Sequence, residues 1–228
     1  MGFQTPQLPL KDLLGQVSDG RLQLPDFQRE YKWDDERIRS LLATLTLGHP
    51  MGVLMMLETG GTETRFKPRP LAGVTRAQDA PDHLLLDGQQ RMTSLFQALK
   101  SGAPVDTKDA RGKIIQRWYY LDISESLGAP AVRDDAVKSV PDDRVFRSDF
   151  GRQVDLDLST DQAAQTAGMF PLYLAFDGAA ATSWLFSFAQ PGGVLDPARF
   201  DLFQRFQTEV LDPMRAYVIP SIQLGRNT

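Results

Sequence analysis

The sequence contains no cysteine, and this absence excludes several classes of protein. Disulfide-stabilised folds, zinc sites built on thiolates and enzymes with a cysteine nucleophile all require that side chain. Histidine is nearly absent as well, because only His49 and His83 occur in 228 residues. A histidine-based catalytic triad or a transition-metal site is therefore not expected. Any chemistry must use carboxylates, amides and arginines.

Long apolar runs and a strong excess of either charge are also lacking. No run approaches the roughly 20 residues of a membrane span, and the first residues do not resemble a signal peptide. The chain has 25 basic and 29 acidic side chains, which is not the overall signature of a nucleic-acid-binding protein. We therefore expect a globular cytoplasmic protein with no membrane partner. Any contact with nucleic acid must come from a local basic patch.

Hydrophobic periodicity predicts a series of helices and strands in the first hundred residues. Glycine or proline follows most of them, as expected at the ends of such elements. The expected elements are a helix over 10–20, a strand over 21–24, a helix from the N-cap Asp34 to Gly48, a buried strand over 51–57, a strand over 83–86 and a helix that carries Met92, Leu95, Phe96 and Leu99.

The remaining segments give weaker signals. Residues 60–81 read as a long loop with a basic patch at Arg65, Lys67, Arg69 and Arg76, and loops of this length are uncommon unless they are functional. Further along, the pattern predicts a strand over 117–123, an acid-rich surface segment over 134–157, a strand or turn over 170–176, a helix over 200–210 that ends before Pro213, and an extended segment over 217–224.

The most informative segment is Asp87-Gly88-Gln89-Gln90-Arg91, at the corner between a strand and a helix. A glycine there lets the backbone approach a ligand, and the start of the helix offers free N–H groups to a phosphate. Arg91 could add a charged fork, the glutamines could orient water, and Asp87 could hold Mg²⁺ through water. The same residues would equally suit a capped helix start with solvated glutamines.

A second cluster, residues 25–33, interleaves aromatic residues with arginine and lysine. Such a loop can stack on bases while its cations meet phosphates. For Phe27 and Trp33, packing in the core is the favoured interpretation. Gln28, Arg29 and Tyr31 are the better functional candidates.

Three segments together resemble the N-terminal domain of GmrSD-type restriction proteins, which belongs to the ParB/sulfiredoxin-like superfamily. They are residues 25–33 (Pro-Asp-Phe-Gln-Arg-Glu-Tyr-Lys-Trp), 48–52 (Gly-His-Pro-Met-Gly) and 87–93 (Asp-Gly-Gln-Gln-Arg-Met-Thr). The resemblance implies an α+β fold. A small mixed ParB-like sheet with flanking helices would occupy 1–104, and an α/β extension of the same domain would occupy 105–228.

The resemblance also implies a function. Such domains bind and hydrolyse nucleoside triphosphates with Mg²⁺, and they couple the nucleotide to recognition of modified DNA in phage defence. The modification is glucosylated or hydroxymethylated cytosine in one branch, as in type IV-like restriction, and a phosphorothioate linkage in the SspE-like branch. A separate C-terminal nuclease domain or a nuclease subunit would cut the DNA.

By this resemblance each group of residues has an expected role. The catalytic group is Asp87, Gln89, Gln90 and Arg91, and Asp87 would also hold Mg²⁺. The nucleotide-binding group is Gln28, Arg29, Gly88, Arg91, Thr93 and Ser94. The group that senses DNA or its modification is Tyr31, Lys32, Trp33, Arg65, Lys67 and Arg69.

Two departures from the family and two alternatives qualify this expectation. The family normally continues past the segment 217–224 into a helical region, and hydrolysis by this chain alone would be weak if that region completes the site. Residues 1–100 hold 12 basic and 12 acidic side chains, so DNA affinity could be low.

The alternative functions are a metal-dependent nuclease that uses Asp87, and a non-catalytic module that docks DNA or a protein through Tyr31 and the basic loop.

Overall fold

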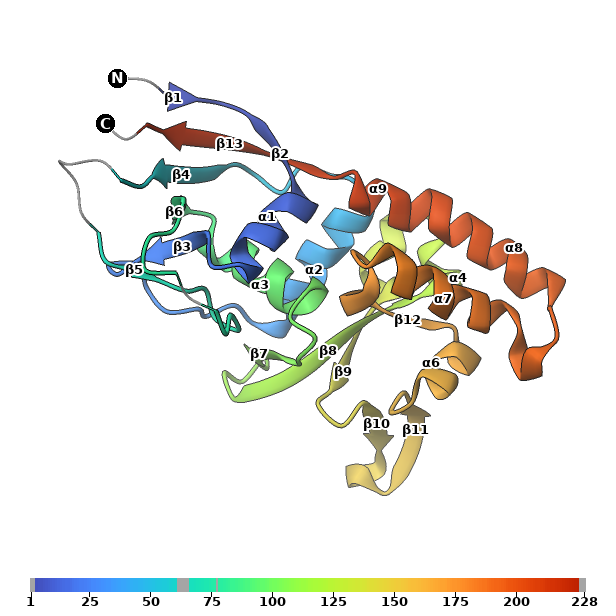
Figure 1. Ribbon diagram of the computed structural model, residues 1–228. Coiled ribbons are helices and arrows are strands. Elements are labelled where there is room, and N and C mark those ends of the chain that lie inside the picture. Colours follow the sequence, from blue (N-terminus) through green and yellow to red (C-terminus); the bar gives the residue numbers. More distant parts are fainter. Residues whose placement is uncertain (1–2, 61–65, 77, 226–228) are drawn as a thin grey trace.

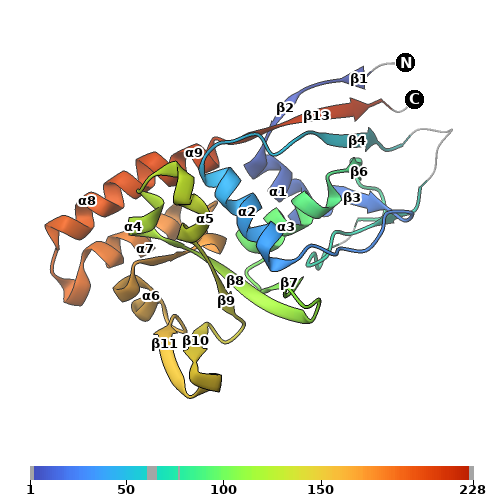
Figure 2. The ribbon, with the colours of Figure 1, turned by 180° about the vertical axis from the view of Figure 1, so that it is seen from behind.

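The structure is a computed structural model that describes residues 3–60, 66–76 and 78–225 (Figures 1 and 2). Its largest sheet is mixed and has the strand order β1-β13-β4-β6-β3-β5, with β2 paired to β13. The β13–β4 and β3–β6 pairs are parallel, and the other pairs are antiparallel. These strands are β1 (Phe3–Gln4), β2 (Gln7–Pro9), β3 (Leu22–Pro25), β4 (Leu54–Glu58), β5 (Pro68–Arg69), β6 (His83–Asp87) and β13 (Val218–Leu224).

Three helices lie together beside this sheet in both views: α1 (Leu10–Ser18), α2 (Asp35–Thr46) and α3 (Gln89–Leu99) (Figures 1 and 2). Helix α2 begins where the Asp34 carboxylate accepts a hydrogen bond from the Arg37 N–H at 2.9 Å, as an N-cap does. Each helix buries an apolar stripe in the common core. Its members include Leu10, Leu13, Leu14, Ile38, Leu42, Leu45, Met92, Leu95 and Leu99.

The rest of the chain forms a second sheet, a hairpin and further helices. The sheet has the order β12-β8-β7, with β9 also paired to β8. Its strands are β7 (Val105–Lys108), β8 (Ile114–Asp122), β9 (Val137–Pro141) and β12 (Met169–Pro171), and the hairpin consists of β10 (Val145–Ser148) and β11 (Gln153–Asp157). The helices are α4 (Ile123–Ser126), α5 (Arg133–Ala136), α6 (Asp161–Ala167), α7 (Gly178–Ala189), α8 (Pro197–Phe206) and α9 (Asp212–Arg215).

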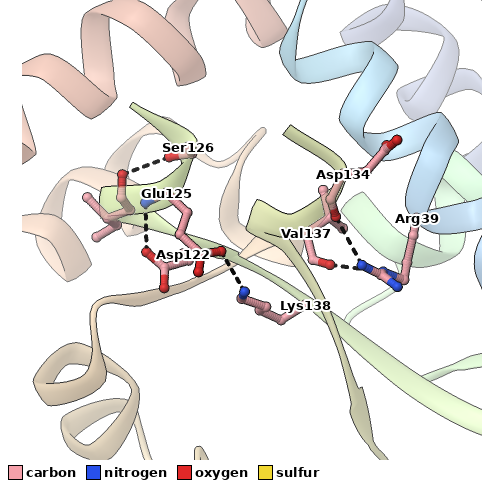
Figure 3. A network of polar contacts seen from close by, with 8 residues as sticks. Arg39, Asp122, Glu125, Ser126, Asp134, Val137 and Lys138 are labelled. Carbon is pink, nitrogen blue, oxygen red and sulfur yellow. Dashed lines mark hydrogen bonds and ion pairs between the residues drawn. The ribbon is translucent and has the colours of Figure 1, made fainter. Parts of the chain in front are cut away.

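Helix α2 joins the two parts. Its Arg39 side chain donates to the carbonyls of Val137 and Asp134, each at 3.0 Å (Figure 3). At the start of the same helix, the Asp35 carboxylate accepts hydrogen bonds from the Tyr119 hydroxyl at 2.8 Å and the Ser139 hydroxyl at 2.6 Å. The second sheet therefore holds α2 by charged and neutral hydrogen bonds as well as by packing.

The mixture of sheets and helices confirms the predicted α+β class, and most expected elements are present. The division at residue 104 stays a prediction; strand β13, from the later part of the sequence, pairs with β1, β2 and β4 in the first sheet. Within the described residues, every helix is too short or too polar to cross a bilayer.

Two expectations were wrong. The acid-rich segment 134–157 is not simply surface, because Ala136, Val137 and Val140 are fully buried. The helix predicted to end before Pro213 continues through it by way of a π-helical turn over Gln207–Leu211. There the Asp212 N–H bonds to the Gln207 carbonyl, and Pro213 follows directly in the first turn of α9.

Candidate functional site

The candidate site forms at the corner between β6 and α3. Gly88 occupies the N-cap of α3 with a φ of 94°, a left-handed conformation that favours glycine. A Cβ added at this position would lie 2.3 Å from Cδ2 of Leu54, which only glycine avoids. Among the residues that the structure describes, no side chain caps the helix, so the first N–H groups of α3 stay available to an acceptor. Together with the helix dipole, these groups favour an anion.

Arg91 anchors the neighbouring segment. Its Nη1 donates to the Met51 carbonyl at 2.6 Å, and its Nη2 donates to the Val53 carbonyl at 2.9 Å. This explains why β4 begins at Leu54 although an apolar strand is predicted from Met51. Gly52, with a φ of 90°, allows the close approach, because a Cβ there would lie 2.6 Å from the Arg91 Nη1. Two of the five guanidinium N–H donors are thus engaged and three remain.

The two glutamines of the motif bind the main chain of the loop over 26–34, which joins β3 to α2. Nε2 of Gln89 donates to the Arg29 carbonyl at 2.7 Å. Gln90 donates from Nε2 to the Glu30 carbonyl at 3.1 Å, and its Oε1 accepts from the Lys32 N–H at 2.8 Å. The structure therefore brings together the two clusters that lie almost 60 residues apart in sequence.

The loop also reaches back to the motif and to the basic segment. Nε2 of Gln28 donates to the Leu86 carbonyl at 2.5 Å, just before the Gly88 turn. Arg69 Nη2 donates to the carbonyls of Gln28 at 2.7 Å and Arg29 at 3.1 Å. Arg69 is half-buried. Because its guanidinium holds these two carbonyls of the loop, it stabilises the loop and does not stand free for a ligand.

Tyr31 and Ser94 form the inner side of the same loop. The two hydroxyl groups lie 2.9 Å apart, and the Ser94 hydroxyl donates to the Gln90 carbonyl at 2.8 Å. Burial raises the pKa of Tyr31 well above its ordinary value, with Ser94 opposing the shift. The tyrosine is therefore a neutral hydrogen-bonding group at physiological pH.

A cavity of about 200 Å³ opens at this corner. Its lining consists of Gln28, Arg29, Trp33, Asp87, Gly88, Gln89, Gln90 and Arg91. Drug-sized ligands usually occupy roughly 300–1,000 Å³, so the space suits a phosphate group better than a whole nucleotide. The side chain of Arg29 is exposed at the cavity, and its guanidinium has no hydrogen-bond partner among the described residues.

One buried polar atom of this cavity lacks a partner. Gln89 is only 5% exposed, and its Oε1 has no hydrogen bond within the described structure. Behind it, the fully buried Thr93 hydroxyl also lacks one. Buried oxygens without partners are rare and costly, because they have lost their water and gained nothing in return. Gln89 can therefore accept a hydrogen bond from a water or a ligand.

The acidic side chains offer a limited site for a metal. Asp87 has a side chain that is 74% exposed and lies 3.7 Å from the Arg91 Nη2. Among the described residues, no three His, Asp or Glu side chains gather at metal-binding distance. Mg²⁺ commonly uses one or two carboxylates together with substrate phosphates, so Asp87 fits Mg²⁺ that arrives with a phosphate ligand.

The other candidates for DNA sensing lie around the loop. Lys32 and Lys67 are exposed, and Arg65 lies outside the described residues. Trp33 is half-buried against the core, and its carbonyl accepts from the Thr107 hydroxyl at 2.9 Å. Phe27 is 60% exposed, so the expectation that it packs in the core was wrong. Its ring lies edge-on to that of Phe66, with 5.0 Å between the ring centroids.

Residues outside the predicted set also shape the site. A side chain added at Gly52 would clash with Arg91, and one added at Gly88 would clash with Leu54. The Thr107 hydroxyl donates a hydrogen bond to the Trp33 carbonyl. Of these, Gly52 had a visible signal, because a glycine inside an apolar run often marks a break in a strand. Thr107 had none, since it lies 74 residues from its partner.

Comparison with known proteins supplies the family. Residues 10–166 match the model described as "GmrSD restriction endonuclease, N-terminal domain", which is well over half of the chain. The chain belongs to this GmrSD N-terminal family. Both the 26–34 loop and the Gly88 corner lie inside the matched region, so membership includes the whole candidate site.

A curated relative of the chain comes from Methanocaldococcus jannaschii. It is called uncharacterized protein MJ0686 and is 33% identical over 97 residues. The match covers 40% of this chain but only 17% of that protein, so the chain corresponds to a small part of the relative. Membership in the GmrSD N-terminal family associates the chain with a restriction-endonuclease system.

Proposed function

We propose that the chain is the nucleoside-triphosphate-binding sensor of a modification-dependent restriction protein. The observation that carries the proposal is the cavity at the start of α3, which combines uncapped N–H groups with the buried, unpartnered Oε1 of Gln89. A phosphate chain would satisfy the N–H groups, and a water held beside it would satisfy Gln89. The nucleoside would lie outside the small cavity.

Within this proposal, cationic contact to the phosphates comes first from Arg29. Its guanidinium is exposed at the cavity and has no partner in the described residues, whereas Arg91 is already tied to two carbonyls. Arg91 can add a further donor while it keeps the corner in shape. Asp87 would hold Mg²⁺, which when bound neutralises charge on the transferring phosphate. Thr93 and Ser94 support the helix start from behind.

For hydrolysis, Gln89 is the residue that would orient the attacking water. Phosphoryl transfer depends mainly on position and on charge stabilisation, and a glutamine amide serves this purpose in other nucleotide hydrolases. Nε2 of Gln89 is already held by the Arg29 carbonyl, so Oε1 has a defined direction. Gln90 has both amide atoms bonded to the loop and therefore positions the loop rather than the water.

The sensing of modified DNA would use the loop that the motif holds. Tyr31, Lys32 and Trp33 lie on this loop, and exposed Lys67 directly precedes strand β5. Because Gln89 and Gln90 contact the loop directly, a change at the nucleotide can alter its position. This coupling is the link between nucleotide and DNA that a restriction sensor with a nuclease partner requires. A metal-dependent nuclease at Asp87 has less support, since the described residues provide no cluster of acids there.

Calorimetric titration with non-hydrolysable GTP, ATP and CTP analogues and Mg²⁺ tests the proposal. We expect saturable binding that weakens at least tenfold in Arg29→Ala and stays unchanged in Arg152→Ala, whose exposed arginine lies in the β10–β11 turn. Gln89→Met should lower the rate of phosphate release more than it lowers affinity, because it removes the oxygen that would hold water. Equal binding by wild type and Arg29→Ala, or no binding of any analogue, would contradict the proposed site.

A further inference from the structure

The hairpin formed by β7 and β8 extends beyond the sheet to which it belongs. Strand β9 pairs with β8 from Arg117 to Leu121, whereas Ile114 to Gln116 pair only with β7 in the described structure. In both views the hairpin lies beside the loop that runs from β3 to α2 (Figures 1 and 2). The 2.9 Å bond from the Thr107 hydroxyl to the Trp33 carbonyl fixes this contact. The end of the hairpin is thus a two-stranded ribbon next to the candidate site.

The turn at its tip is rigid. The Asp109 N–H donates to the Lys113 carbonyl at 3.0 Å, and the Gly112 N–H donates to the Asp109 carbonyl at 2.9 Å. The Asp109 carboxylate accepts from the N–H groups of Arg111 and Lys113, and Gly112 takes a φ of 80°. Since a fixed turn loses little entropy on binding, the side chains that it carries are presented in place.

The tip is basic in a chain that is otherwise acidic. Residues 106–117 carry four basic and two acidic side chains, whereas residues 118–228 carry nine basic and 15 acidic ones. Lys108, Arg111 and Lys113 make no side-chain hydrogen bond or ion pair within the described residues, and both nearby acids are occupied. Beside these cations, Ile114 is 72% exposed. Free cations around an exposed apolar side chain fit phosphates that flank a sugar.

We propose that the β7–β8 hairpin binds the sugar–phosphate backbone of duplex DNA, with Lys108, Arg111 and Lys113 on phosphates and Ile114 against a sugar. A two-stranded ribbon is narrow enough to enter the major groove of DNA. The contact would lie beside Lys32 on the site loop, since Thr107 and Trp33, their direct neighbours in sequence, are bonded to each other. The inference concerns DNA affinity and is independent of nucleotide binding.

Fluorescence anisotropy with a labelled unmodified duplex, without nucleotide and over a series of salt concentrations, tests the hairpin. In the triple variant Lys108→Gln, Arg111→Gln and Lys113→Gln, we expect the affinity to fall at least tenfold. The slope of log affinity against log salt should become shallower by about 2 to 3, since each lost phosphate contact removes about 0.9. Thermal unfolding should be unchanged, because these side chains make no hydrogen bond or ion pair with any residue that the structure describes.

A matched control carries the same charge change elsewhere: Lys11→Gln, Lys100→Gln and Arg152→Gln, which are exposed residues outside the hairpin. This variant should keep the wild-type affinity and slope. Equal losses in both triple variants would mean that only the net charge matters and would overturn the proposal. Wild-type protein that does not bind the duplex at low salt, or a hairpin variant that binds it normally but no longer binds RNA or an acidic protein partner, would overturn it as well.

Discussion

Gly88 is the residue whose conformation the site depends on most directly. A substitution to alanine there has two costs, the left-handed φ of 94° and the approach of the new Cβ to Leu54 at 2.3 Å. We expect Gly88→Ala to lower the free energy of unfolding by about 2–4 kcal/mol, as urea denaturation would measure. Nucleotide binding should weaken too, because the first turn of α3 must move.

Gly102 provides the matched control for this prediction. It also has a left-handed φ, 68°, but an added Cβ there would meet no atom within 4 Å. Gly102→Ala should therefore lose only the backbone term, about 1–2 kcal/mol. Equal losses for the two variants would show that the contact with Leu54 relaxes freely. The close packing would then not define the Gly88 corner.

At this scale, the sequence was sufficient to pick out two segments that the structure brings together, but not their contacts. Gly88 and the segment 25–33 were recognisable, because glycine at a strand-to-helix corner and mixed aromatic and basic residues have known physical uses. The bonds from Arg91 to Met51 and Val53 were not, since hydrogen bonds to backbone carbonyls across about 40 residues leave no pattern in side-chain type. A residue that looks free in sequence can thus be occupied in the fold.

Among the elements, strand β8 shows how the second sheet supports the site. It buries the successive side chains of Tyr119 and Tyr120, and the Tyr119 hydroxyl donates to Asp35 at the start of α2. Burial raises the pKa of Tyr119 far above its ordinary value, with the Asp35 charge adding to the shift, and burial raises the pKa of Tyr120 to about 12. Both side chains must lose a proton to become charged, so the folded state resists their ionisation.

The raised pKa values predict that the protein becomes less stable at alkaline pH. These tyrosines contribute fully to the free energy of unfolding below their unfolded pKa, near 10. That contribution is lost as the pH rises from there toward their pKa values in the folded state. We expect tyrosinate absorbance to rise together with unfolding for these residues, and Tyr119→Phe to shift the alkaline unfolding midpoint upward. That variant also breaks the bond to Asp35, so its stability at pH 7 should fall by about 1 kcal/mol. A titration that reaches full tyrosinate absorbance before circular dichroism changes would contradict the expected coupling.

The elements themselves were predictable where local signals were complete. Helix α2 has the N-cap Asp34, a regular apolar stripe and a terminal glycine, and it was expected almost as it is found. Helix α7 was not expected, although Asp177 caps it and alanines follow, because its mostly apolar sequence lacks a clear polar face. Pro213 misled the prediction because a π-helical turn, which depends on tertiary packing, lets the helix pass it.

In the whole molecule, neighbouring strands of the first sheet come from distant parts of the sequence. Strand β13 pairs with β4 over Ser221–Leu224, and it also pairs with β1 and β2. The first sheet thus includes strands from both ends of the described sequence, since β1 and β13 lie next to each other (Figure 1). Sequence patterns identified 217–224 as extended, but no local signal assigns a parallel partner about 165 residues away.

This arrangement predicts that residues 1–104 do not fold alone, although they hold the whole candidate site. Without β13, strand β4 would present an unpaired edge, and its neighbours would lose the packing of Ile219, which is 2% exposed. We expect a fragment of residues 1–104 to aggregate or to lack a cooperative thermal transition in circular dichroism. A second fragment, with 217–225 joined to it by a flexible linker, should recover at least part of the transition. A cooperative transition in the unlinked fragment would show that the first sheet is stable without its central parallel strand, and would make residue 104 a true domain boundary.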